Sequence, residues 1–108
     1  MTKSELIRLI GDVIIEVDVL RSGFPRGTIK RNALDNHRDD LDTLQRKLVR
    51  SVIGDNTREF QNLTASLSEV NTELRETIDE VNKIAETLES LVKFIGVVQK
   101  IVELIPLA

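Results

Sequence analysis

The stretch that decides the fold runs from Phe60 to Ile105 and reads FQNLTASLSEVNTELRETIDEVNKIAETLESLVKFIGVVQKIVELI. Two interleaved series of sites, each spaced seven residues apart, run through it, and thirteen of their fourteen sites are apolar. A hydrophobic repeat of about 3.5 residues, kept over many turns, is typical of a helix whose apolar stripe packs along a partner helix. We call this stripe the heptad seam; its members are Phe60, Leu63, Leu67, Val70, Leu74, Val81, Ile84 and Leu88.

The seam predicts a single long helix over residues 57–105. At about 1.5 Å per residue such a helix would be ~70 Å long. A compact chain of this size has a radius of gyration of only about 13 Å. The molecule is therefore expected to be a rod, or the helix to break near residues 90–96, where Gly96 lies.

A second helix is predicted over residues 29–53, joined to the long one by a turn at 54–56. Gly54 suits a left-handed C-terminal cap, and Asp55 or Asn56 suits the next N-cap. Residues 21–53 carry a net charge of +4 and residues 54–90 a net charge of −6. So short a connection and opposite charges favour an antiparallel helical hairpin.

A third helix is predicted over residues 3–20, because Thr2 and Glu5 form a capping-box pattern ahead of an apolar run. Residues 21–28 contain Gly23, Pro25 and Gly27 and are expected to form a loop. The fold class predicted for the whole chain is all-α, one domain over 1–108 with three helices. The helix over residues 3–20 and the C-terminal part of the long helix, residues 91–105, both carry apolar arcs too wide for one partner helix. We therefore expect a homo-oligomer, most simply a dimer, that completes the bundle.

Composition excludes several chemistries. The 108 residues include no Cys, no Trp, no Tyr, one His and three Phe, at a net charge of −3. A thiol nucleophile, a disulfide framework and a Cys-bound metal are thus absent. Too few aromatic residues for base stacking and a negative net charge argue against a nucleic-acid partner. No cofactor is expected.

Three small groups of polar residues could carry chemistry, and each has a simpler structural reading. Asp35, Asp39 and Asp42 share one helix face that could hold a hard cation, but neighbouring arginines favour ion pairs. His37 lies on an apolar stripe. Its charge could respond to pH, or it could simply be a partly exposed residue at the edge of the core. The exposed carboxylates Glu73, Glu76, Asp79 and Glu80 suit the flank of a coiled coil better than a dry acid–base pair, so no enzyme is expected.

The expected interaction surface is the apolar face of the C-terminal helix. It comprises Leu91, Phe94, Ile95, Val98, Ile101 and Val102. This face predicts a non-enzymatic scaffold or adaptor that binds another copy or another helical protein. The alternative is that the same face engages a lipid bilayer. Charged residues interrupt the N-terminal run and residues 91–108, which argues against a signal peptide or a spanning helix and favours a cytoplasmic location.

Overall fold

Four α-helices and one short 3-10 helix make up the computed structural model, which describes residues 1–106. They are α1 (Lys3–Arg21), α2 (Ile29–Val49), α3 (Arg58–Thr77), η1 (Val81–Lys83) and α4 (Ile84–Val102). Within residues 1–106 there is no strand, so the all-α prediction is confirmed, whereas the count of three helices is wrong. The bundle measures 41 × 26 × 17 Å, with a Cα radius of gyration of 14.0 Å. These dimensions are those of a short bundle and not of a ~70 Å rod.

Threonine side chains begin three of the helices. The Thr2 hydroxyl accepts the amide of Glu5, whose carboxylate accepts the amide of Thr2 in return, so the predicted capping box is present. Thr28 caps α2, and Thr57 caps α3 by accepting the amide of Phe60. The predicted cap at residues 55–56 is therefore one residue early. Each such cap satisfies an amide that the first helical turn leaves unpaired.

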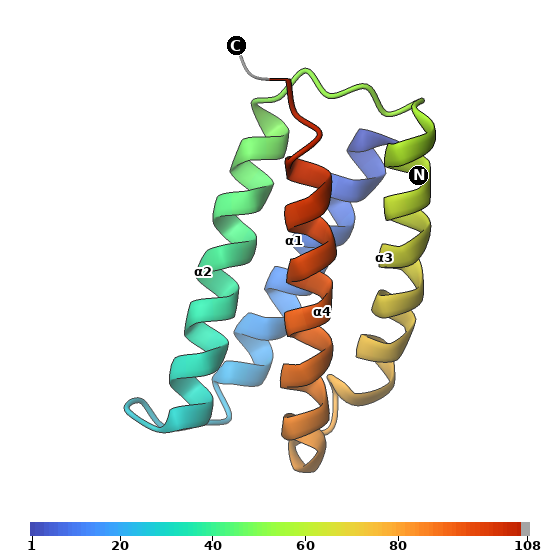
Figure 1. Ribbon diagram of the computed structural model, residues 1–108. Helices are drawn as coiled ribbons and strands as arrows, with labels where there is room; N and C mark the ends of the chain where they lie inside the picture. The colour runs from blue at the N-terminus through green and yellow to red at the C-terminus, as the bar shows by residue number, and fades with distance from the viewer. Residues whose placement is uncertain (107–108) are drawn as a thin grey trace.

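In Figure 1, α2 and α3 lie on the left and right of the bundle, and α4 lies in front of α1. Contacts are closest between α3 and α4, between α1 and α2, and between α2 and α4. Residues 50–57 connect α2 to α3 by crossing one end of the bundle (Figure 1). The predicted hairpin of residues 29–53 with 57–105 is thus corrected: α2 runs antiparallel to α3 but lies across the bundle from it and packs against α4 instead, because the connection is long enough to cross.

The predicted long helix is broken between Thr77 and Ile84 and not near residues 90–96. Ile78 closes α3 by donating its amide to the Leu74 carbonyl, and Glu80 then takes an extended conformation with φ −112° and ψ 108°. Gly96 remains inside α4. No glycine or proline lies at the break. The reversal instead returns the apolar face of α4 to the bundle, and each large aliphatic side chain buried there contributes about 1.5–3 kcal/mol.

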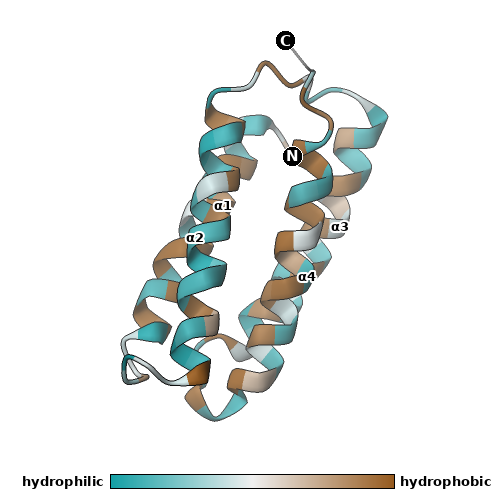
Figure 2. Ribbon diagram, turned by 60° about the vertical axis from the view of Figure 1, so that its left-hand side comes forward, coloured by the Kyte–Doolittle hydropathy of each residue, from teal (hydrophilic) through white to brown (hydrophobic). Residues whose placement is uncertain are grey.

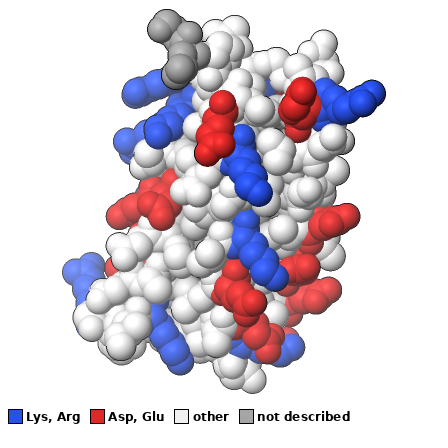
Figure 3. Space-filling model, viewed as in Figure 1, with Lys and Arg blue, Asp and Glu red and all other residues white. Residues whose placement is uncertain are grey.

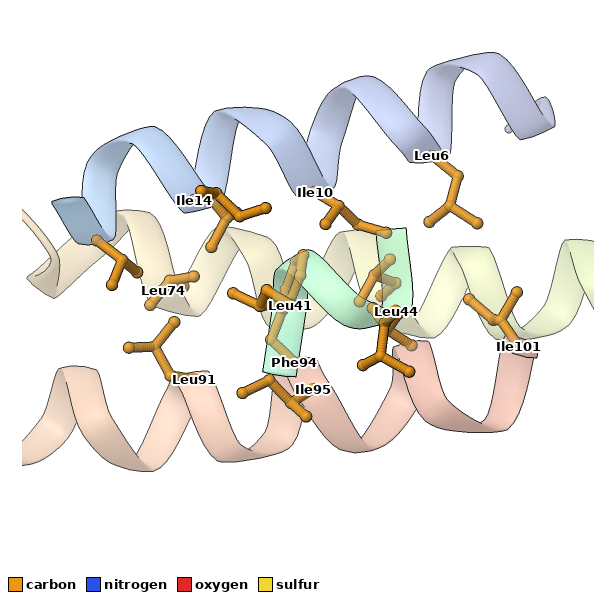
Figure 4. Packing of buried hydrophobic residues seen from close by; sticks show 14 of the residues in the cluster. Leu6, Ile10, Ile14, Leu41, Leu44, Leu74, Leu91, Phe94, Ile95 and Ile101 are labelled. Carbon is orange, nitrogen blue, oxygen red and sulfur yellow. The ribbon is translucent and has the colours of Figure 1, made fainter. Parts of the chain in front are cut away.

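The core is built from all four helices. In Figure 4, Leu6, Ile10, Leu41, Leu74, Leu91 and Phe94 point toward one another from α1, α2, α3 and α4. Figure 2 shows the hydrophobic residues gathered on the inward sides of the helices. Four members of the heptad seam, Phe60, Leu67, Leu74 and Ile84, are buried within this one chain. The buried seam residues therefore pack against helices of the same molecule.

Two threonines form a hydrogen-bonded pair inside this apolar core. Thr87 is fully buried and its hydroxyl donates to Thr77 Oγ1 at 2.9 Å, and Thr77 donates to the Leu74 carbonyl at 3.4 Å. The pair joins α4 to the end of α3. Thr77, the polar exception in the heptad repeat, is therefore matched by a second polar side chain that the repeat does not predict.

Removing one member of this pair should destabilise the chain more than removing both. Thr77→Val leaves the Thr87 hydroxyl buried without its acceptor and is expected to lower the free energy of unfolding by about 1–3 kcal/mol. The double variant T77V/T87V replaces both hydroxyls by methyl groups and should recover most of that loss. Urea unfolding followed by circular dichroism measures both values. Equal losses in the single and double variants would contradict the pairing.

Candidate functional site

The face predicted to bind a partner is instead part of the core. Leu91, Phe94, Val98 and Ile101 have no exposed surface, and Ile95 is 6% exposed. Val102, at the end of α4, is partly buried. The physical reason is the break after Thr77, which turns this face toward α2 and α3. As an open surface, this prediction was wrong.

The remaining seam residues differ in their exposure. Leu63, Val70 and Leu88 are partly buried against the core. Val81 stands at the break, in η1, and is 54% exposed. The heptad pattern therefore identified core positions of α3 and α4, but it did not identify one continuous binding ridge.

A groove of about 880 Å³ lies at the end of the bundle where α2 and α4 finish. We call it the end groove; its lining residues are Lys47, Arg50, Ser51, Val52, Val102, Glu103, Ile105 and Pro106. Val52 is 90% exposed and nearby Val49 is 58% exposed, values that are high for large aliphatic residues. Figure 2 shows the hydrophobic colouring continuing along the α2–α3 connection and past the end of α4. A groove lined by apolar side chains and a few polar groups is a candidate binding site.

The N-terminus holds the α2–α3 connection beside the groove. The backbone amide of Lys3 donates to Asp55 Oδ2 at 2.9 Å, and Lys3 Nζ donates to the Ser51 carbonyl. Gln61 Nε2 donates to the carbonyls of Met1 and Asp55, at 2.9 and 2.6 Å. Ile53, next to Val52, is 9% exposed and anchors the segment in the core. Val52 is therefore displayed by a connection that is fixed at both sides.

The rim of the end groove is basic. Lys47 and Arg50 are exposed on the last turn and C-cap of α2, and neither forms an ion pair with any residue of the described chain. Glu103 contributes one carboxylate to the opposite wall. Basic side chains gather beside this end of α2, and acidic ones gather over the far ends of α3 and α4 (Figure 3). The groove combines an apolar floor with a mainly positive edge.

Of the three aspartates predicted to share one face of α2, Asp35 and Asp42 form ion pairs, and Asp39 is exposed. Asp35 Oδ1 lies 3.0 Å from both Arg21 Nη1 and Arg31 Nε, and Asp42 pairs with Arg46 at 2.9 Å. The hydrogen bond from Arg21, with that from Arg31, holds the pKa of Asp35 below its ordinary value. Among residues 1–106 there is no group of three or more His, Asp or Glu side chains placed to hold a metal ion.

The loop between α1 and α2 is organised by one arginine. Arg31 Nη1 donates to the carbonyls of Arg21 and Phe24, at 3.0 and 3.1 Å. Gly27, the residue of this loop with a left-handed backbone at φ +89°, completes the turn before Thr28. Arg26 is exposed in the same loop. The Arg31 guanidinium is therefore engaged by groups of this chain.

His37 lies half-buried on α2, and burial lowers its pKa while the nearby Asp40 carboxylate partly opposes that change. A folded pKa below the unfolded value of about 6.5 means that the unfolded chain binds the proton more readily. The free energy of unfolding should therefore fall as the pH drops below about 6.5. The chain has one His, so His37→Gln should remove this step in a urea-unfolding series. A stability that rises over the same pH interval would contradict a desolvated imidazole.

No helix in the described part of the chain is long and apolar enough to cross a membrane. Comparison with known protein families, with curated proteins and with solved structures gives no match.

Proposed function

We propose that this protein is a non-enzymatic helical adaptor, and that it binds an amphipathic segment of a partner protein in the end groove. The observation that carries the proposal is the aliphatic floor formed by the exposed Val52 and the partly buried Val102 and Ile105, edged by Lys47 and Arg50. An apolar ridge on the partner would cover the floor, as in other helix-in-groove complexes. Acidic residues beside that ridge would face Lys47 and Arg50, which favours them over a basic partner.

A lipid bilayer is the competing binding partner for the apolar residues. The face of α4 that the sequence offered to a bilayer is buried, so its contact with lipid would require the bundle to open. The end groove is concave and fixed by the hydrogen bonds of Lys3 and Gln61. A concave, basic-edged site fits a protein segment better than a flat membrane surface.

Peptide titration tests the proposal directly. Two synthetic helical peptides share one leucine ridge and differ in their flanks, one carrying Glu and the other Lys. Methyl NMR signals of Val52, Val102 and Ile105 are expected to shift with the Glu peptide and much less with the Lys peptide. Val52→Asp should weaken binding at least about tenfold, because burying one Val side chain contributes roughly 1.5 kcal/mol.

The matched control is Val92→Asp, since Val92 is 57% exposed on α4 and does not line the groove. This control should bind the Glu peptide within about twofold of the unmodified chain. Anionic phospholipid vesicles form the third arm. Binding to vesicles without binding to either peptide, or equal losses in V52D and V92D, would overturn the adaptor proposal.

A further inference from the structure

The opposite end of the bundle carries a second apolar depression. It has a volume of about 350 Å³ and lies between the end of α1 and the turn that joins α3 to α4. We call it the acidic hollow; its walls include Val19, Leu20, Ile78, Val81, Glu16 and Asp79. Val19 is 70% exposed and Val81 is 54% exposed. Each end of the molecule thus displays aliphatic side chains to solvent.

The charges at this second surface are mainly negative. Asp79 and Glu80 are exposed, and Glu16 Oε2 is buried without a hydrogen-bond partner in the described residues. Two basic side chains lie close by and form ion pairs with carboxylates: Lys83 with Glu80 at 3.6 Å, and Arg75 with Glu16. The α1–α2 loop and the first turn of α2, which carry Arg26 and Lys30, reach the same end of the bundle (Figure 1). Around Val81 the net charge is therefore negative.

Both ends expose apolar side chains, and the charges beside them are opposite in sign. One offers an apolar groove edged by Lys47 and Arg50, and the other offers an exposed valine edged by Asp79 and Glu80. They lie at opposite ends of the 41 Å long axis (Figure 1). Pairing like ends would place equal charges together, which costs free energy, whereas pairing unlike ends joins opposite charges.

We infer that the occupant of the end groove is a second copy of this chain. It docks through the turn between α3 and α4, which carries Asp79, Glu80 and Val81 and forms one wall of the acidic hollow. This inference rests on the proposed function and names its partner. The contact is heterologous, because different surfaces of the two copies meet. Each docked copy still presents its own free end groove, so the contact propagates head to tail and builds linear or ring-shaped oligomers.

Blocking one end at a time tests this arrangement. Sedimentation and light scattering of the unmodified chain should show oligomers that grow with concentration and shrink in about 1 M salt, where charges are screened beyond roughly 3 Å. Val52→Asp blocks the groove and Val81→Asp blocks the turn, so each variant alone should be monomeric. Mixed in equal amounts, they should form a 1:1 dimer and nothing larger, because only one intact groove and one intact turn remain to meet.

Charge exchange provides the second arm. K47E/R50E and D79K/E80K should each assemble at least about tenfold more weakly than the unmodified chain, and mixing them should restore assembly through two charge-matched contacts. Val92→Asp, the control, should assemble normally. A monomeric unmodified chain, or a V52D and V81D mixture that stays monomeric or grows beyond a dimer, would overturn the inference. If the Glu peptide still binds the groove in that case, the adaptor proposal stands while self-docking falls; if the peptide also fails, both fall.

Discussion

Phe94→Ala is expected to lower the free energy of unfolding by about 3–5 kcal/mol, a large share of the roughly 5–15 kcal/mol that stabilises a domain. Phe94 has no exposed surface and, in Figure 4, points into the cluster that also contains Leu41 and Ile95. Its removal loses the apolar contact area and leaves a cavity that the surrounding helices fill only in part. Urea unfolding monitored by circular dichroism measures the loss.

A surface residue of the same helix supplies the control. Val92 is 57% exposed, and Val92→Ala should change the free energy of unfolding by no more than about 0.5 kcal/mol. If α4 instead presented an open interaction face, as the sequence alone indicates, Phe94→Ala would cost as little as Val92→Ala. Such equality would contradict the four-helix core.

Proline substitution at two sites of the predicted long helix should have very different effects. Ser66 is exposed in the middle of α3, and Ser66→Pro removes a helical hydrogen bond and clashes with a preceding carbonyl, costing about 3 kcal/mol or more. Val81 begins η1, and the residue before it, Glu80, already has the extended backbone that precedes proline. Val81→Pro should therefore stay within about 1 kcal/mol of the unmodified chain.

The comparison isolates the break from side-chain effects, because both substituted residues are exposed. Thermal and urea unfolding of the two variants provide the readout. A helix that continued through residue 81 would be disrupted by both prolines to a similar extent, and comparable losses at Ser66 and Val81 would rule out the reversal between α3 and α4.

Local signals predicted much of the fold. The helix starting after Thr2, the loop around Gly27 and the helical character of every long segment follow from capping residues, turn residues and the period of the apolar positions. The heptad spacing also selected side chains that are buried in the structure, such as Phe60, Leu67 and Leu74. These features depend on residues that are neighbours along the chain.

The reversal after Thr77 could not be predicted in this way. Asp79 and Glu80 are compatible with an exposed helix flank, and no glycine or proline interrupts the repeat there. What favours the turn is the burial of the apolar face of α4 against α2, a contact between segments far apart in the sequence. A heptad pattern states that a partner helix is needed, but not whether that helix lies in another chain or in the same one after a turn.

The end groove was missed for a related reason. Val52 lies in what was predicted to be the end of a helix, and its exposure arises because the connection crosses the bundle while Ile53 is anchored in the core. The only signal in the sequence was the short Arg50-Ser51-Val52 run beside a basic helix end. Val102 alone belongs both to the predicted interaction surface and to the groove.

The four-helix bundle within one chain is tested most directly by the separation of residues 73 and 93. Glu73 Oε2 lies 3.8 Å from Lys93 Nζ across α3 and α4, and the absence of cysteine allows spin labels at Glu73→Cys and Lys93→Cys. Electron paramagnetic resonance, with excess unlabelled chain to suppress intermolecular pairs, should give strong short-range dipolar broadening, because packed helix axes lie about 8–10 Å apart. A continuous helix would instead separate the two sites by about 30 Å along its axis, and that distance in the diluted sample would contradict the fold described.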